Sequence, residues 1–217
     1  MQNAECKMNC LNSLRDLIWP RKCILCGRLM GPQGDRLCAA CAASLPEPIS
    51  GARRGSHYKR WASALWYEGP FRASFHRFKF GGCRFYAGVY GPWLAEAIRT
   101  RLGTDYDLMT FVPISARRRW RRGYDQTLLL AREAGARLDL PPTATLRKRH
   151  RPPQSQTLRR ADRQTNIQGA FTVPDPAKVR GKRILLIDDV MTTGATVTEA
   201  AQALQSAGAK SIDFRDN

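Results

Sequence analysis

The sequence predicts an α/β domain in which helices flank a parallel sheet, preceded by a small cysteine-rich module. Residues 184–187 form a short, continuous apolar run, which is typical of a strand buried on both faces. A second apolar strand, at residues 108–113, leads through a polar segment into an apolar helix. Near the amino terminus, two Cys-x-x-Cys pairs lie close together, a spacing that favours a bound metal ion.

The segment that follows the first of these strands combines two features that suit a sugar phosphate. Asp188 and Asp189 come directly after the strand, and open α/β sheets bind ligands at the carboxyl ends of their strands. Residues 192–196 form a turn of small residues before a helix, and main-chain amides in such a turn bind phosphate. The alternative interpretation is an ordinary strand-loop-helix connection with an acidic cap.

The spacing of apolar residues predicts the helix and the strand that come after this turn. Apolar residues from Val197 to Ala207 recur at helical spacing, and Gly208 suits the end of that helix. Residues 211–214 then predict a further strand. Neither a Gly-Lys-Ser/Thr phosphate loop nor a Gly-x-Gly-x-x-Gly fingerprint is present here, which excludes the two commonest nucleotide-binding motifs.

The amino-terminal module, residues 1–50, contains Cys23-x-x-Cys26 and Cys38-x-x-Cys41. Two such pairs at this separation predict a zinc ion held tetrahedrally by four thiolates, and a site with no open position is structural. The alternative is a set of buried or redox-active cysteines. The main domain is expected at residues 56–217.

The chain carries a strong positive charge. Among 217 residues, 36 are Lys or Arg and 18 are Asp or Glu, which gives a formal net charge of +18. Such an excess favours a polyanionic partner, with nucleic acid first and an anionic membrane surface second. Residues 111–170 hold 14 of the basic residues and 4 of the acidic ones. The alternative for such charge runs is a solvated face.

No apolar stretch is long enough for a membrane span, and the amino terminus lacks the apolar core of a signal peptide. The seven cysteines are an odd number, which a secreted disulfide framework would not favour. We therefore expect a reducing, cytoplasmic setting.

Residues 58–93 contain 12 of the 19 aromatic side chains, interleaved with basic residues. Such a pattern suits the stacking of single-stranded bases, but we expect most of these rings to form core. Among the basic residues of this segment we assign a functional role to Lys79. It lies in the sequence Phe-Lys-Phe-Gly-Gly, and a lysine close to a Gly-Gly turn is expected to reach a pyrophosphate.

Two basic segments are candidates for contact with nucleic acid. The first is expected to be a loop between the strand at 108–113 and the helix that starts near Gln126. The second belongs to a long polar stretch at residues 147–169, and a loop of this length is usually functional or disordered. The candidate residues are Arg117, Arg118, Arg119, Arg121, Arg122, Arg147, Arg149 and Arg151.

The run from Ile184 to Thr196 resembles the phosphoribosyl-pyrophosphate (PRPP) signature of type I phosphoribosyltransferases. Further motifs extend the resemblance to the ComF family of competence-associated, phosphoribosyltransferase-fold proteins over nearly the whole chain. They are the paired cysteine module, Phe78-Lys79-Phe80-Gly81, Val112-Pro113, Arg122-Gly123-Tyr124-Asp125-Gln126, Gln154-Ser155-Gln156 and Arg163-x-x-Asn166-x-x-Gly169-Ala170-Phe171.

The resemblance implies a type I phosphoribosyltransferase-like sheet, with Asp188 and Asp189 on the ribose 2- and 3-hydroxyls. Mg²⁺ would accompany PRPP, and Lys79 with arginines of residues 117–122 would neutralise the pyrophosphate. Lys79, Asp188 and Asp189 are thus the catalytic candidates, and residues 147–169 would form a mobile hood that excludes water. The remaining residues expected to bind PRPP are Met191, Thr192, Thr193, Gly194, Ala195 and Thr196.

Two functions stay open at this stage. The first is a ComF-like protein of DNA uptake and natural transformation, whose PRPP-binding domain also binds single-stranded DNA and which works beside a DNA-uptake helicase. The alternative is an active, Mg²⁺-dependent phosphoribosyltransferase that transfers ribose 5-phosphate from PRPP to a nitrogenous base. A transcription regulator is less favoured, because no helix-turn-helix pattern precedes the domain.

Overall fold

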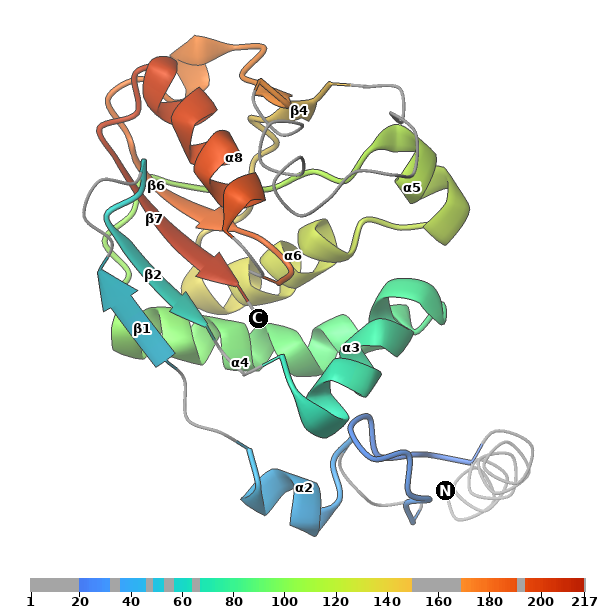
Figure 1. The fold of residues 1–217 in the computed structure, drawn as a ribbon. Helices are drawn as coiled ribbons and strands as arrows, with labels where there is room; N and C mark the ends of the chain where they lie inside the picture. The colour runs from blue at the N-terminus through green and yellow to red at the C-terminus, as the bar shows by residue number, and fades with distance from the viewer. Residues whose placement is uncertain are drawn as a thin grey trace, which may run out of the picture.

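The computed structural model describes residues 20–31, 36–45, 49–52, 57–63, 67–149, 169–190 and 194–216 (Figure 1). Five strands form the main sheet in the order β1-β2-β7-β6-β3. Strand β1 runs antiparallel to β2, and the other neighbours are parallel, as the sequence predicts for this domain. The strands are β1 (Ile49–Ala52), β2 (Arg60–Ser63), β3 (Leu108–Phe111), β6 (Arg183–Ile187) and β7 (Ser211–Asp216).

Strand β6 is buried on both faces, as its apolar run predicts. Leu185 and Ile187 pack in one hydrophobic core, and Ile184 and Leu186 pack in the other. This alternation is the two-residue period of a strand, and it shows that helices cover both faces of the sheet. Strand β6 pairs with β3 on one side and with β7 on the other, so it is a central strand.

Helices lie on both sides of the sheet (Figure 1). On one side, α4 and α6 pack against each other, α4 contacts β2 and α6 contacts β3, and α3 joins the same core. On the other side lies α8, which follows β6 as predicted and ends before Gly208 at φ +94°. The helices are α3 (Gly69–Phe80), η1 (Arg84–Tyr86), α4 (Ala87–Arg101), α6 (Gln126–Leu138), η2 (Pro176–Lys178) and α8 (Ala195–Ser206).

Most rings of the aromatic segment do form core, in agreement with the preferred interpretation. Phe75, Phe78 and Tyr90 are fully buried and in mutual contact, with ring centroids 5.4–5.6 Å apart. Phe80 and Phe85 are different, because each is 52% exposed.

Residues 116–122 form a short helix, α5 (Ala116–Arg122), so the expectation of a loop there was wrong. Arginine is a good helix former, and no glycine or proline interrupts the segment before Gly123. Ser115 caps the helix by accepting a hydrogen bond from the Arg118 N–H at 3.4 Å, and Gly123, at φ +75°, ends it. Because α5 buries none of its residues, its sequence has no apolar period to reveal it.

The two ends of the expected hood, residues 147–169, are joined by a pair of short strands. Strand β4 (Arg147–Lys148) pairs antiparallel with β5 (Phe171–Thr172), and the Arg149 N–H donates to the Ala170 carbonyl at 2.8 Å. The segment between them, residues 150–168, lies outside the described residues and includes Arg151.

The amino-terminal module contains a cysteine-bearing turn and helix α2 (Ala39–Ala43). Strand β1 follows and pairs with β2 of the main sheet. The expected domain boundary at residue 50 therefore falls within a strand of that sheet. Within the parts of the chain described here, no helix is long and apolar enough to cross a bilayer.

A buried carboxylate ties β7 to β2, and we expect its removal to destabilise the sheet. Asp213 is 6% exposed and accepts hydrogen bonds from the Arg60 N–H at 3.1 Å, the Arg60 guanidinium and the Tyr106 hydroxyl at 2.9 Å. Asp213→Asn should lower the free energy of unfolding by about 1–3 kcal/mol, because it leaves buried donors without an acceptor of matching charge. Urea denaturation of zinc-saturated protein measures this change.

Glu96→Gln is the control for that experiment, since it removes a carboxylate from an exposed pair with Arg99. It should change the stability by less than about 0.5 kcal/mol. Equal effects of the two substitutions would contradict the role assigned to Asp213.

Candidate sugar-phosphate and zinc sites

The two predicted acids lie directly after β6, at the carboxyl edge of the sheet. Asp188 is 8% exposed, and its N–H donates to the Arg215 carbonyl at 2.9 Å, which extends the pairing between β6 and β7 by one residue. The Asp189 N–H donates to Asp188 Oδ1 at 2.8 Å. The first acid is therefore held within the sheet, and the second projects into the space beyond it.

Asp189 is contacted by side chains from two other elements. Lys79 Nζ, near the end of α3, lies 3.1 Å from Asp189 Oδ1, and both side chains are 15% exposed. Gln126 Nε2, at the start of α6, donates to Asp189 Oδ2 at 2.5 Å. The structure therefore brings Lys79 and Asp189 together, two residues that the sequence places 110 positions apart.

The start of α6 is fixed by Asp125, which caps the helix. Its two carboxylate oxygens accept from the N–H groups of Leu128 at 3.1 Å and Ile114 at 3.2 Å. Burial raises the pKa of Asp125, although these N–H groups act in the opposite direction. The neighbouring Tyr124 hydroxyl donates to the Phe78 carbonyl and so holds the start of α6 against α3. These contacts place Gln126 next to Lys79.

Two further cations, both partly buried, lie close enough to these acids to interact with them electrostatically: Lys148 with both and Arg122 with Asp189. Burial and the nearby positive charge of Arg118 lower the pKa of Lys148, whereas Asp188 and Asp189 act to raise it. Burial also lowers the pKa of Arg122, and Asp189 opposes this effect. Each cation lies over an aromatic ring, Lys148 at 5.1 Å from the Phe171 centroid and Arg122 at 4.5 Å from that of Phe80.

Gln126 and Lys148 were not among the predicted site residues. The sequence carries no local signal for Lys148, because Arg147 and Arg149 on either side have the same charge and only the structure shows that Lys148 is less exposed than they are. Gln126 is 1% exposed, and its Oε1 is buried without a hydrogen-bond partner among the described residues. A buried, unsatisfied amide oxygen next to a carboxylate is unusual and indicates a place where a ligand donor fits.

The predicted phosphate loop is described at its end only. Met191, Thr192 and Thr193 lie outside the described residues. Gly194 precedes α8 with φ +74°, a conformation that side chains rarely adopt, and its carbonyl accepts from Thr198 Oγ1 at 2.9 Å. Ala195 and Thr196 form the first turn of α8, so their main-chain amides belong to a helix N-terminus.

The other basic candidates within the described residues lie on the surface. Arg117, Arg118, Arg119 and Arg121 are exposed on α5. Arg122 is set apart from them by its partial burial against Phe80.

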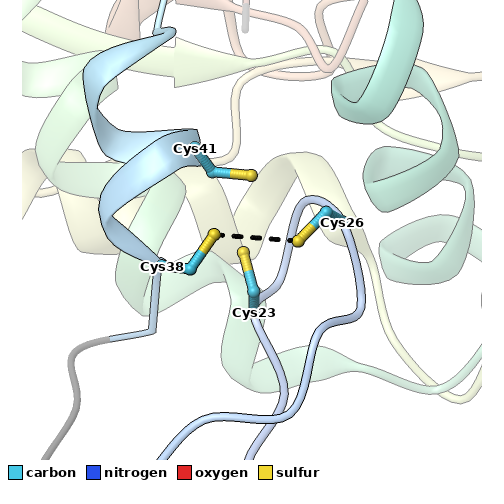
Figure 2. Close-up of side chains that lie close together, drawn as sticks. All are labelled: Cys23, Cys26, Cys38 and Cys41. Carbon is cyan, nitrogen blue, oxygen red and sulfur yellow. Dashed lines mark hydrogen bonds between the residues drawn. The ribbon is translucent and has the colours of Figure 1, made fainter.

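The four predicted zinc ligands converge in the amino-terminal module (Figure 2). Cys23 and Cys26 come from one turn and Cys38 and Cys41 from the start of α2, and the four Sγ atoms lie within 4.8 Å of one another. Tetrahedral zinc-thiolate bonds of about 2.3 Å place sulfur atoms about 3.8 Å apart, which is the distance between the Sγ atoms of Cys26 and Cys38. The cluster therefore fits a structural zinc ion.

The environment of these thiols favours the charged form of one of them. Burial raises the pKa of Cys23, but N–H groups of Cys38, Cys26 and Leu25 outweigh it and lower that pKa to about 6. Burial and the neighbouring thiols raise the pKa of Cys41 to about 12. A bound zinc ion would supply the positive charge that lets all four sulfurs be thiolates together.

The zinc module is docked on the helix that carries Lys79. The Ser74 hydroxyl donates to the Ile24 carbonyl, and Arg77 Nη2 donates to the carbonyls of Ile24 at 2.7 Å and Leu25 at 2.9 Å. Because Ile24 and Leu25 lie between the first two cysteines, these bonds connect the metal-binding turn to α3.

Comparison with known proteins identifies both parts. Residues 126–214 match the family model of the phosphoribosyl transferase domain, and residues 14–53 match that of the double zinc ribbon domain. The chain is 30% identical to the DNA utilization protein YhgH of Salmonella typhimurium over 199 residues, which cover 88% of this chain and 86% of that protein. It thus combines a zinc ribbon with a phosphoribosyltransferase-type domain.

Two further relatives carry competence names. Competence protein ComFC of Streptococcus pneumoniae is 32% identical over 151 residues, 67% of this chain and 62% of that protein. Competence protein F of Haemophilus influenzae is 35% identical over 103 residues, 46% of this chain and 45% of that protein. The chain belongs to the ComF family, as the motifs in its sequence predict.

Removal of one zinc ligand should lower both the metal content and the stability. We expect Cys41→Ser to reduce bound zinc by one equivalent and the melting temperature by roughly 5–10 °C, because binding of a structural zinc ion contributes to folding. Metal analysis of the purified protein and a thermal melt measure the two effects.

Cys83→Ser is the matched control, since Cys83 lies outside the four-thiol cluster and its thiol contacts the Gly81 carbonyl. An unchanged zinc content in Cys41→Ser would show that the four thiols do not form the site.

Proposed function

We propose that this protein binds PRPP together with Mg²⁺ at the carboxyl edge of its sheet, binds single-stranded DNA on its basic surface, and acts in DNA uptake in the cytoplasm. The observation that carries the proposal is the surroundings of Asp189, where an acid at the end of β6 contacts Lys79 and Gln126 and interacts electrostatically with Arg122 and Lys148. The names of the relatives, which refer to competence and DNA utilization, support the role in DNA uptake.

The charges around Asp189 suit the parts of PRPP. Asp188 and Asp189 offer carboxylates for the ribose hydroxyls, and the start of α8 offers main-chain amides for the 5-phosphate. Lys79, Arg122 and Lys148 offer positive charge for the pyrophosphate. Hard carboxylate and phosphate oxygens are also the ligands that Mg²⁺ prefers, and the ion would neutralise part of the ligand's charge.

Lys79 has two roles in this proposal. Without ligand it compensates the charge of Asp189 at 3.1 Å. With PRPP bound, a ribose hydroxyl donates to Asp189, and the lysine is free to contact the pyrophosphate. The buried Oε1 of Gln126 supplies a second acceptor for a ligand hydroxyl at the same place.

Catalytic phosphoribosyl transfer is a second candidate function, and the grouping of three cations around Asp189 favours it. In that reaction the bond between ribose C1 and a pyrophosphate oxygen breaks, and its electron pair leaves with pyrophosphate. A bond from C1 to a nitrogen of the acceptor base forms, and that nitrogen loses a proton. Fixed positive charge near the leaving group stabilises such a transition state. Release of pyrophosphate in the presence of nitrogenous bases distinguishes transfer from binding alone.

Single-stranded DNA would lie on surfaces near this site. Helix α5 exposes four arginines, and β4 exposes Arg147 beside Lys148. Phosphates of a nucleic acid strand bind such groups with release of counterions, so the affinity should depend strongly on salt.

Addition of PRPP with Mg²⁺ should stabilise the folded protein. At a ligand concentration about 100 times the Kd the gain is about 2.7 kcal/mol, or roughly 5–10 °C in melting temperature for a chain of this size. We expect Asp189→Asn to lose this shift and Lys148→Gln to weaken PRPP binding about tenfold. A thermal-shift titration of each zinc-loaded variant measures both.

Arg147→Gln is the control for Lys148→Gln, because it removes the same charge from the neighbouring, exposed position of β4. It should bind PRPP as the wild type does. A wild-type protein that is folded and zinc-loaded but shows no shift would contradict the proposed PRPP site.

The DNA proposal predicts a defined salt dependence. If about six phosphates are contacted, the plot of log affinity against log salt concentration should have a slope near −4. Replacement of Arg117, Arg118 and Arg119 by Gln should reduce that slope by about 2. Fluorescence anisotropy with a labelled oligothymidine at several salt concentrations measures the slope.

A matched triple variant removes the same charge at the opposite edge of the sheet. Lys178, Arg180 and Lys210 are exposed and lie before the starts of β6 and β7. Their replacement by Gln should leave the slope unchanged. An equal loss in both triple variants would indicate a response to net charge alone.

A further inference from the structure

Two large aromatic side chains are exposed beside arginines on the surface between the zinc module and α5. Trp120, in the middle of α5, is 87% exposed, and Phe85, in η1, is 52% exposed. Tryptophan usually has much of its surface buried, so a ring this exposed on a helix of arginines contributes little to packing among the residues that the structure describes.

Side-chain contacts connect the zinc module, η1 and α5, the elements that carry or adjoin these two rings. The guanidinium of Arg36, from the zinc module, lies 4.7 Å from the centroid of the Phe85 ring. Next to Phe85, Arg84 Nη2 donates to the carbonyl of Gly123 at 2.7 Å, and Gly123 is the residue that ends α5. A line of contacts therefore runs from the zinc module through η1 to α5, and in Figure 1 the zinc module, the end of α3 and α5 follow one another along one side of the molecule.

Phe80 is equally exposed but is not equivalent. Its ring contacts His76 at a centroid distance of 4.7 Å and lies under the Arg122 guanidinium at 4.5 Å. Arg122 also acts on the charge of Asp189, so Phe80 belongs to the surroundings of the sugar-phosphate site. Phe85 has contacts within the chain as well, with Arg36 over its ring and the Tyr86 ring at a centroid distance of 4.8 Å, but none of them connects it to that site.

We infer that Phe85 and Trp120 are stacking platforms for two bases of a single strand of DNA, which runs from the zinc module across η1 to α5. Arginines beside the rings, among them Arg36, Arg84 and Arg121, neutralise the strand's phosphates. This inference rests on the proposed binding of single-stranded DNA and names the residues that carry it. An exposed ring beside a cation fits an unpaired base, because the base offers a flat apolar face and a phosphate next to it.

A single strand suits this surface better than a duplex does. In a duplex the bases are stacked on one another, and only their edges are accessible in the grooves. Stacking on a protein ring is also tolerant of sequence, because every base has such a face. The strand is therefore expected to bind with little dependence on sequence.

The test compares ring-retaining with ring-removing variants in the full-length, zinc-loaded protein. Trp120→Leu and Phe85→Leu should each weaken the binding of an oligothymidine by about 5- to 100-fold. Trp120→Phe and Phe85→Tyr should bind nearly as the wild type does. Anisotropy titrations over a range of salt concentrations give both affinity and salt slope.

The salt slope separates stacking from charge. The leucine variants should retain the wild-type slope, because a ring releases no counterions, whereas Arg84→Gln should reduce it by about 0.7. An abasic oligonucleotide of the same length should bind the wild type and Trp120→Leu with equal affinity. Leu29→Ala is the control for loss of an exposed apolar side chain without a ring, since Leu29 is 64% exposed on the zinc module.

Two failures are distinguishable. If the leucine variants bind single-stranded DNA as tightly as the wild type, the stacking inference is overturned and the proposed DNA binding stands. If the wild type itself does not bind single-stranded DNA at low salt, the proposed DNA binding and this inference are overturned together.

Discussion

The ion pair between Lys79 and Asp189 is the interaction that connects the helical part of the molecule to the candidate site at the edge of the sheet. It joins the end of α3 to the end of β6, and both side chains are largely buried, so the pair is shielded from water. The same helix carries Ser74 and Arg77, which hold the carbonyls of the metal-binding turn. A single helix therefore connects the zinc module to the sugar-phosphate site, and the position of Lys79 depends on how α3 is seated at both places.

Elements with strong local signals could be predicted from the sequence. Strand β6 and helix α8 have apolar patterns of the right period, and the four cysteines have a spacing that few other structures share. Helix α5 could not be predicted in this way, because a helix that buries nothing shows no period. The position of β7 between β2 and β6 is likewise a tertiary feature, since pairing partners far apart in sequence leave no local pattern.

The candidate site likewise contains residues that a local motif predicts and residues that only the tertiary structure brings together. The two acids after β6 were predictable because the motif is continuous, whereas Gln126 and Lys148 reach them from segments 63 and about 40 residues away in sequence. The arginines of residues 117–122 also differ from one another in how far they are buried. Arg122 packs on Phe80 and faces Asp189, while its neighbours in the same run of arginines are exposed, a distinction that charge alone does not reveal.

The position of β7 has a consequence for the order in which the protein forms during synthesis. Among the described strands β7 is the last in sequence, yet it alone links β2 to β6, and Asp213 contacts Arg60 across 153 positions. Until β7 leaves the ribosome, the β1-β2 hairpin and the β6-β3 pair are not joined in one hydrogen-bonded sheet, and the apolar strand β6 has an open edge. Such an edge pairs readily with other chains, so the nascent protein is most prone to aggregate after β6 has emerged and before β7 has.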